Sequence, residues 1–182
     1  EKISVSTGLI YTILLCGLAF LVLINFNYFT ILIALASMPL AFTYPLMKRY
    51  TYWPQLFLGI TFNYGLILGW TSISESINII PIIFYLGAIF WTLGYDTIYG
   101  YQDIKDDEII GLKSTSIKFK GTAKYFLIIC YSILLFLFIM GGYLMDFNFF
   151  YFLFLIIPAA QLFLFQIRSF DSNNPSTCLK IF

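Results

Sequence analysis

The chain has 182 residues, of which 60% are hydrophobic and only 10% are charged, and its mean hydropathy is +0.89. A soluble domain carries about 25% charged residues, so this composition excludes an ordinary soluble domain and indicates a membrane protein. The formal net charge of +1 gives no support to nucleic-acid binding. The chain has no His and its three Cys lack a metal-binding spacing, which excludes zinc, haem and Ser-His-Asp chemistry.

Six apolar stretches follow one another along the chain, each near the roughly 20 residues that a helix needs to cross a bilayer. They are residues 8–24, 28–47, 54–73, 77–95, 125–145 and 147–167. The connections between them are too short to fold alone. We therefore expect an all-α, polytopic transmembrane helical bundle with six spans, in a single domain over residues 1–182. The first stretch is not expected to be a cleaved signal peptide, because too many others follow it.

The basic residues predict the orientation of these spans. Lys and Arg occur before the first stretch, between the second and third, between the fourth and fifth, and after the sixth, whereas the alternate connections carry none. The positive-inside rule then places all ten basic residues in the cytoplasm. Cys178 should share that side and react there with an impermeant thiol reagent.

The segment "GYDTIYGYQDIKDDEIIGLKST" (94–115) holds five of the nine acidic residues. If the fourth helix continues past Tyr95, Asp96, Asp103 and Asp107 project from nearly one face, with Gly100 beside them. Carboxylates without His or Cys suit Mg²⁺, which prefers one or two carboxylates plus phosphate oxygens, so the pattern points to a phosphorylated substrate. The alternative is a solvated connector, in which five Lys balance the acidic residues.

A second polar segment, residues 43–59, lies on the same predicted side. Lys48 and Arg49 are either topology anchors or ligands of phosphate oxygens. Gln55, just inside the third stretch, either packs between helices through a hydrogen bond or contacts a substrate. Both alternatives stay open at this point.

The motifs resemble those of a known family. "YDTIYGYQDIKDDEIIGLKST" (95–115) closely resembles the second aspartate-rich motif of the UbiA superfamily of intramembrane prenyltransferases, D-x-x-Y-[AG]-x-x-D-x-x-D-D followed by G-x-K-S-T. "YPLMKRYTYWPQLFLG" (44–59) and "DSNNPSTCLKIF" (171–182) are similar to segments of its 4-hydroxybenzoate polyprenyltransferase branch. Members resemble nine-helix proteins with an earlier N-D-x-x-D-x-x-x-D motif, which does not occur here. We therefore expect these spans to be helices three to eight, and the domain to be incomplete at both ends.

The resemblance implies an enzyme that uses Mg²⁺ to transfer a polyprenyl group from polyprenyl diphosphate to the ring carbon ortho to the hydroxyl of 4-hydroxybenzoate, in ubiquinone biosynthesis. Asp106 lies off the predicted stripe, and its role is open. The roles implied for the motif residues are metal binding by Asp96, Asp103 and Asp107, catalysis by Asp96, Asp103 and Arg49, and substrate binding by Lys48, Arg49, Tyr99 and Lys113.

Three alternatives remain at this stage: a family member with another aromatic acceptor, a small polytopic transporter, and a non-enzymatic scaffold. Transporters place their sites near the midplane, whereas these carboxylates lie at a membrane edge. The expected location is a bacterial inner or mitochondrial inner membrane, with the active site on the cytoplasmic or matrix side. The two substrates and the bilayer are the expected partners, with no nucleic acid and no required protein partner.

Overall fold

The computed structural model describes residues 3–172, 174, 178 and 181, and these form helices and connections without a strand. The helices are α1 (Val5–Leu23), α2 (Tyr28–Thr43), η1 (Tyr44–Leu46), α3 (Met47–Tyr50), α4 (Pro54–Phe62), α5 (Tyr64–Ser74), α6 (Ile79–Tyr99), α7 (Ile104–Ile110), α8 (Thr115–Lys118), α9 (Ala123–Leu144), α10 (Phe149–Phe154), α11 (Ile156–Ala160) and the π-helical η2 (Gln161–Ile167). Six segments are long and apolar enough to cross a membrane, and they match the six predicted stretches. The all-α prediction is confirmed.

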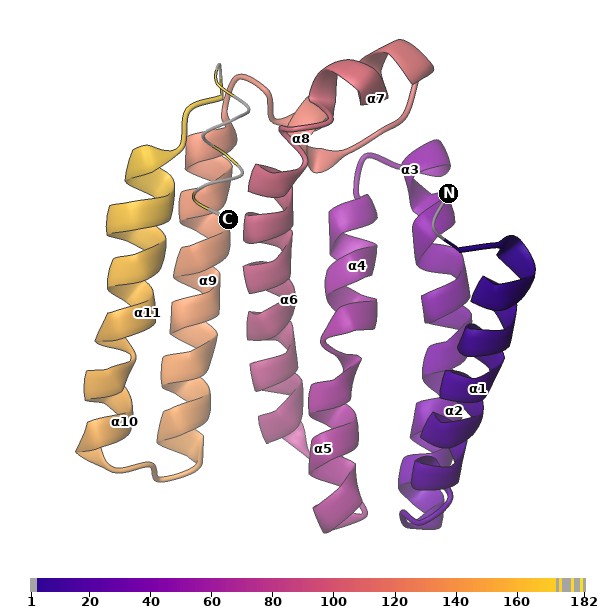
Figure 1. Cartoon of the computed structure of the whole chain (residues 1–182). Helices are drawn as coiled ribbons and strands as arrows, with labels where there is room; N and C mark the ends of the chain where they lie inside the picture. The colour runs from indigo at the N-terminus through magenta and orange to yellow at the C-terminus, as the bar shows by residue number, and fades with distance from the viewer. Residues whose placement is uncertain (1–2, 173, 175–177, 179–180, 182) are drawn as a thin grey trace.

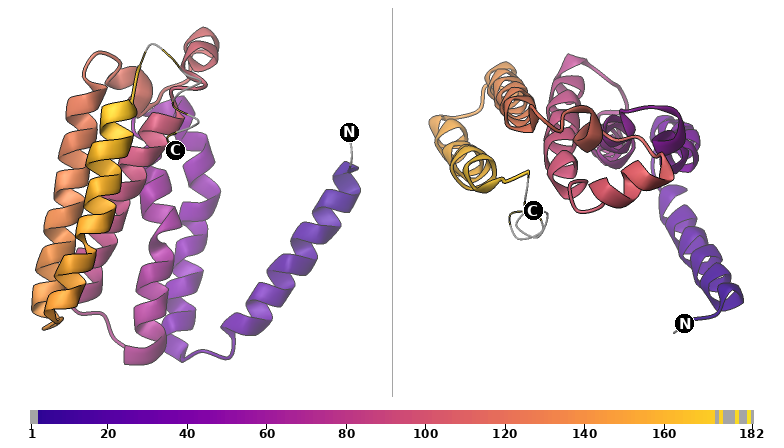
Figure 2. Two further views of the ribbon diagram at one scale, coloured as in Figure 1. Left: turned by 60° about the vertical axis from the view of Figure 1, so that its left-hand side comes forward. Right: turned by 90° about the horizontal axis from the view of Figure 1, so that it is seen from above.

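The long helices stand side by side and run alternately up and down (Figure 1). Seen from above, α10 and α11, α9, α6, α4 and α2 follow an open arc, and α1 leans away from its end (Figure 2). No residue of α1 is buried. The packed part of the molecule therefore begins at α2 and centres on α6.

The pair formed by α6 and α9 is the centre of the bundle. Phe138 of α9 packs over Gly87 of α6, and Phe84 of α6 packs over Gly141 of α9. The rings of Phe84 and Phe138 meet edge to face, with centroids 5.4 Å apart. Small residues let transmembrane helices approach closely, so these glycines explain why α6 and α9 lie against each other.

The third span is interrupted at Asn63, between α4 and α5, and the side chain of Asn63 links this span to α6 by hydrogen bonds. The Nδ2 of Asn63 donates hydrogen bonds to the carbonyl of Gly59 (2.9 Å), the carbonyl of Ala88 (3.1 Å) and the Oγ1 of Thr92 (2.7 Å). Its side chain thus bonds its own helix and α6 at the point where α4 ends and α5 starts. This polar link holds the α4 end of the span against α6.

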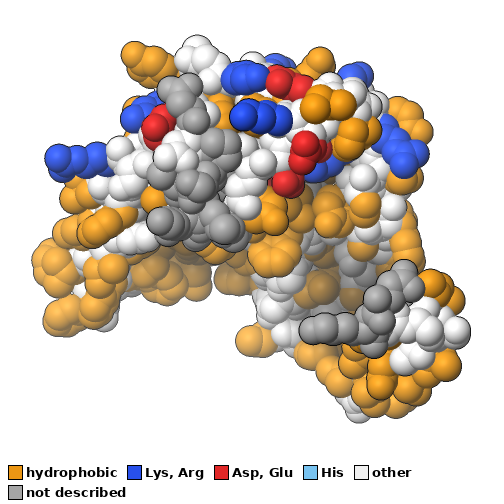
Figure 3. Space-filling model, turned by 45° about the horizontal axis from the view of Figure 1, so that its top comes forward, with side chains coloured by type: hydrophobic (Ala, Val, Ile, Leu, Met, Phe, Trp, Pro, Cys, Tyr) orange, Lys and Arg blue, Asp and Glu red, His pale blue; other side chains and the backbone are white. Residues whose placement is uncertain are grey.

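Most of the described charged residues lie at one end of the bundle, which we call the charged end; Glu75 and Asp146 lie in connections at the other end. The short helices α3, α7 and α8 lie at the charged end (Figure 1). Lys, Arg, Asp and Glu side chains gather there above a band of hydrophobic side chains (Figure 3). The connections at the other end, residues 24–27, 75–78 and 145–148, contain no Lys or Arg. The fold thus brings the two polar segments of the sequence to the same end.

Candidate functional site

The two halves of the aspartate-rich segment lie on different helices. α6 ends at Tyr99, and the chain turns before α7 begins at Ile104. Asp96 lies within α6, Asp103 is the residue that precedes α7, and Asp107 lies within α7. The prediction that one continuous helix presents all three carboxylates on one face is therefore wrong.

The turn has a local cause in a side chain from further along the sequence. In a continuing helix the carbonyl of Thr97 would accept from the N–H of Tyr101. It accepts instead from the Oγ of Ser116, at 2.7 Å, while the N–H of Tyr101 bonds to the carbonyl of Ile98. A Cβ at Gly100 would collide with the Oγ of Ser116. The glycine thus leaves room for the hydroxyl that ends the helix.

Two further hydrogen bonds fix the segment before α8 against α4 and α6. The Oγ1 of Thr97 donates to the carbonyl of Leu93 (2.6 Å), so it must accept from the Oγ1 of Thr115 at 2.6 Å. The backbone N–H of Thr115 donates to the Oε1 of Gln55 on α4, at 3.0 Å. We call Thr97, Thr115 and Ser116 the hydroxyl cluster; all three are fully buried, at 0% exposure.

A cavity of about 250 Å³ opens beside this cluster, and we call it the Asp96 cavity. Its lining comes from the end of the second span, the start of α4 and the end of α6: Tyr44, Pro45, Lys48, Pro54, Gln55, Leu58 and Asp96. A carboxylate, an ammonium group, a carboxamide and a phenol thus meet in a space with otherwise apolar walls. Such a cavity suits an anionic ligand that is joined to an apolar body.

Lys48 lies between the Asp96 cavity and a second one. Its Nζ is 3.4 Å from the Oδ2 of Asp107, whose side chain is buried. The second cavity, about 510 Å³, lies between α3 and the end of α7 and is lined by Pro45, Lys48, Arg49, Ile110, Gly111 and Leu112. Arg49 lines this second cavity and not the Asp96 cavity. The two adjacent basic residues therefore share the second cavity, and only Lys48 also reaches the Asp96 cavity.

The remaining predicted residues lie outside both cavities. Lys113 holds the segment before α4: its N–H donates to the carbonyl of Lys48 (2.8 Å), and its Nζ donates to the carbonyl of Tyr50 (3.2 Å). Its role as a diphosphate ligand stays a prediction. Three further residues are exposed and line neither cavity: Tyr99, Asp103 and Asp106.

The acidic residues fit a divalent cation that arrives with a phosphorylated ligand. Among the described residues, no three Asp, Glu, His or Cys side chains gather closely enough to enclose a metal ion by themselves. Asp96 and Asp107 each adjoin Lys48, one through the shared cavity and one through the ion pair. Mg²⁺ is commonly bound by one or two carboxylates, with phosphate oxygens and water as the other ligands. Asp96 and Asp107 match that requirement in number and in chemical type.

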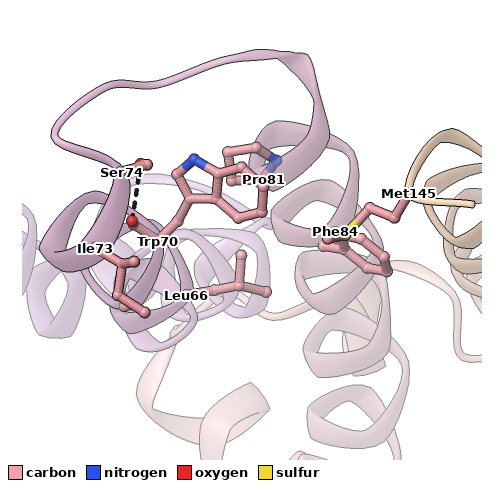
Figure 4. A pocket seen from close by; sticks show the side chains of 8 residues that line it. Leu66, Trp70, Ile73, Ser74, Pro81, Phe84 and Met145 are labelled. Atoms are coloured by element: carbon pink, nitrogen blue, oxygen red, sulfur yellow. Dashed lines mark hydrogen bonds between the residues drawn. The ribbon is translucent and has the colours of Figure 1, made fainter. Parts of the chain in front are cut away.

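Two larger cavities lie deeper in the bundle. One, of about 550 Å³, lies between α6, α9 and η2; its lining includes Trp91, Leu134, Phe138 and Leu162, with Asn63, Gln161 and Gln166 as polar members. The other, of about 420 Å³, lies at the end opposite α3, α7 and α8, and Trp70, Pro81, Phe84 and Met145 border it (Figure 4). Neither lining contains a charged side chain. These spaces suit hydrocarbon.

Cys178 is buried at the charged end, contrary to the expectation of a reactive thiol there. The ring of Tyr101 packs edge to face on Phe170, with centroids 5.0 Å apart. Burial, and secondly the nearby Cys178, raise the pKa of Tyr101 to about 12, so its phenol is neutral and donates to the carbonyl of Lys120 at 3.3 Å. Cys178 belongs to the buried core at this end, together with Tyr101 and Phe170.

The sequence analysis missed Tyr44 and the hydroxyl cluster. Tyr44 precedes Lys48 by one helical turn, and this spacing was the available signal. Ser116 follows Lys113 in a run of three hydroxyl residues, but the run does not reveal that its partner is the end of α6. For Gln55 the sequence leaves two roles open, a hydrogen bond in packing and a contact with substrate. The bond from the N–H of Thr115 to its Oε1 confirms the packing role.

The fold and the site define an integral membrane protein of membrane-length helices, with a cavity for an anionic group at one end and apolar cavities within the bundle. The profile of the UbiA prenyltransferase family matches residues 1–182. The chain belongs to that family. Family members generally use a divalent metal.

Several relatives carry names that specify an activity. The chain is 38% identical, over 89% of its length, to the mitochondrial 4-hydroxybenzoate polyprenyltransferase of Dictyostelium discoideum, of which it covers 35%. It is 40% identical, over 88% of its length, to 4-hydroxybenzoate geranyltransferase 2 of Lithospermum erythrorhizon, of which it covers 53%. It is 38% identical, over its whole length, to the mitochondrial 4-hydroxybenzoate polyprenyltransferase of Drosophila melanogaster, of which it covers 46%.

The chain thus spans between about a third and a half of these relatives. No solved structure matches it.

Proposed function

We propose that the protein transfers a polyprenyl group from polyprenyl diphosphate to the ring carbon ortho to the hydroxyl of 4-hydroxybenzoate. The observation that carries the proposal is the Asp96 cavity, where a carboxylate and the ammonium group of Lys48 face one space at the end of an apolar bundle. Names of relatives that share 38% to 40% identity supply the substrates.

The diphosphate would bind at the charged end. Lys48 offers its ammonium group to phosphate oxygens, as a point charge. Asp96 and Asp107 would hold Mg²⁺, the proposed form of the divalent metal. When bound, Mg²⁺ neutralises charge on the leaving diphosphate. Asp103, which precedes α7, is proposed to approach the metal from the exposed side, with Tyr99 and Lys113 as further substrate contacts.

The prenyl chain would extend into the bundle. The cavity of about 550 Å³ between α6, α9 and η2 offers Trp91, Leu134 and Phe138 to hydrocarbon. Its apolar lining excludes water from the reacting carbon, which matters because an allylic cation is trapped by water as readily as by an aromatic ring. The face of an aromatic ring such as Trp91 also attracts positive charge that develops there.

In the reaction, the bond between the prenyl C1 and the diphosphate oxygen breaks, and its electron pair leaves with the diphosphate. A new carbon–carbon bond forms between C1 and the ring carbon, which then loses its proton to the released diphosphate or to water. Arg49 lines the cavity next to Lys48 and is proposed to attract the anionic substrates from the aqueous side. Lys48 is shared by the two cavities and stabilises the leaving group electrostatically.

The proposed location is a bacterial inner or mitochondrial inner membrane, with the charged end on the cytoplasmic or matrix side. The placement of the basic residues supports this orientation. The product would enter ubiquinone biosynthesis.

The test is prenyl transfer by the full-length protein, purified in detergent, with a labelled prenyl diphosphate and Mg²⁺. The acceptors are 4-hydroxybenzoate, homogentisate and a dihydroxynaphthoate. We expect product from 4-hydroxybenzoate, loss of product with EDTA, and little product from the others. Lys48→Gln removes the charge, keeps a polar group on a side chain one atom shorter, and should raise the KM for the prenyl diphosphate. Transfer to homogentisate alone would show that the proposed acceptor is wrong.

A further inference from the structure

We propose that Gln55 is a substrate-binding residue, whose side-chain amide donates a hydrogen bond to an anionic oxygen of the diphosphate in the Asp96 cavity. This inference rests on the proposed function and adds to it a neutral ligand on α4. Gln55 is 3% exposed, lines the Asp96 cavity and lies in the first turn of α4.

The orientation of the amide follows from its partner. A backbone N–H can only donate, so the atom of Gln55 that meets the N–H of Thr115 at 3.0 Å must be the carbonyl oxygen, Oε1. The Nε2 therefore points the other way. Thr115 is itself fixed through its hydroxyl bond to Thr97. A donor held in this way loses little side-chain entropy when it binds a ligand.

The other atom of the amide is available to a ligand. The Nε2 of Gln55 has no hydrogen-bond partner among the described residues, and it is not one of the buried atoms left unpaired. It lies close to Gly100, where a Cβ would approach it to 3.3 Å. Gly100 thus lies beside the amide, and the Oγ of Ser116 occupies the space at that glycine. Because Gln55 lines the Asp96 cavity, this unpaired donor can bond an acceptor bound there.

The charges of the cavity indicate which acceptor. Asp96 and Lys48 line it together with Gln55. Lys48 also pairs with Asp107 of α7 at 3.4 Å, and its ammonium group can attract a further anion into the cavity. The first turn of α4, with Pro54 at its start, adds the partial positive charge of a helix N-terminus. A diphosphate offers several anionic oxygens to these groups at once. The carboxylate of the aromatic acceptor has the same chemistry, so the experiment must separate the two sources.

The experiment uses Gln55→Glu in the full-length protein. Glutamate keeps an oxygen for the N–H of Thr115 and replaces the donor with a second oxygen, which repels phosphate. We measure binding of inorganic diphosphate with Mg²⁺ by calorimetry in detergent, and the KM values of both substrates. Loss of a hydrogen bond to a charged group corresponds to about a tenfold to hundredfold change in affinity. We expect this loss for inorganic diphosphate and for the prenyl diphosphate, with the KM for 4-hydroxybenzoate changed by less than about twofold.

Two control variants isolate the amide. Thr122→Glu introduces the same charge at an exposed position of the same end, outside the Asp96 cavity, and should leave the affinity for diphosphate unchanged. Thr97→Val removes the hydroxyl that accepts from Thr115 but keeps the amide group of Gln55, so it shows how much affinity depends on the fixed position of Thr115. An equal loss of affinity in either control would overturn the inference, because the effect would then come from charge alone or from a loosened segment.

The outcomes separate this inference from the proposed function. If the wild type transfers the prenyl group and Gln55→Glu binds diphosphate normally, the role of Gln55 is wrong and the function stands. A loss confined to 4-hydroxybenzoate also overturns it, because the amide would then bind the carboxylate of the acceptor. If the wild type transfers no prenyl group but loses diphosphate affinity through Gln55→Glu, the inference holds and the proposed function is wrong.

Discussion

Helices α1 and α6 are both long apolar spans, yet the protein uses them in opposite ways. α1 has the higher mean hydropathy of the two, but none of its residues is buried, whereas 44% of the apolar window of α6 is buried. α6 presents glycines and threonines to its neighbours and carries Asp96 at its charged end. Hydropathy therefore identifies which segments cross the membrane, while small and polar residues decide which of them pack and which of them bear the site.

The largest expected effect concerns the one carboxylate of α6. Asp96→Asn should lower kcat by at least about a hundredfold, because it removes a proposed metal ligand without changing the shape of the side chain. Prenyl transfer at a series of Mg²⁺ concentrations measures the effect. Membrane insertion and thermal melting should be unchanged. Near-normal turnover at low Mg²⁺ would show that α6 does not carry the metal site.

The second prediction compares Gly94 on α6 with Gly17 on α1. Gly94→Ala places a methyl group against the ring of Tyr131, which is fully buried and bonded to Gln166 at 2.8 Å. Overpacking of this kind costs about 1–3 kcal/mol. Gly17→Ala on α1 meets nothing within 4 Å and should not destabilise the protein. Thermal melting in detergent compares the two variants, and equal melting temperatures would contradict the packing of α6 against α9.

A third prediction tests the hydroxyl cluster at the end of α6. Ser116→Ala removes the donor to the carbonyl of Thr97 and leaves that buried carbonyl without its partner. The expected cost is about 1–2 kcal/mol of unfolding free energy. Ser116→Thr keeps the hydroxyl and is the matched control. If Ser116→Ala melts at the wild-type temperature, the hydroxyl does not hold the end of the helix.

The smallest effect is on thiol accessibility, with no change of stability expected. Cys16 on α1 is exposed, whereas Cys130 on α9 and Cys178 are buried. A small membrane-permeant maleimide should therefore label Cys16 alone in the folded protein, as mass spectrometry of peptides can show. Fast labelling of Cys130 would mean that α6 and α9 separate.

Thiol labelling with an impermeant reagent tests the orientation. Because Cys178 is buried, the probe is a Cys introduced at an exposed position. Lys105→Cys places a thiol at an exposed site of the charged end. It should react with an impermeant reagent only from the cytoplasmic or matrix side, because the basic residues share that side. Glu75→Cys, in the connection between α5 and α6, should react only from the other side. Reaction of both from one side would mean that the number of spans is wrong.

The sequence alone determined the spans and the general location of the site. Length and hydropathy suffice for spans, because a bilayer requires an apolar helix of a set length whatever its neighbours are. The alternation of basic connections placed both polar segments at one end, and the structure has them there. The motif around Asp96 likewise pointed to the family that the comparison confirms.

Only the tertiary structure decided how that motif is divided. Helical periodicity placed Asp96 and Asp107 on one stripe. In the structure the carbonyl of Thr97 accepts from the hydroxyl of Ser116, 19 residues later, in place of the backbone N–H that would continue the helix. The pairing of Lys48 with Asp107 spans 59 residues of sequence, so local spacing contains no trace of it. A helix end that is set by a distant side chain, and an ion pair between separate helices, depend on which elements pack together. A pattern read residue by residue along the chain does not contain these contacts between distant elements.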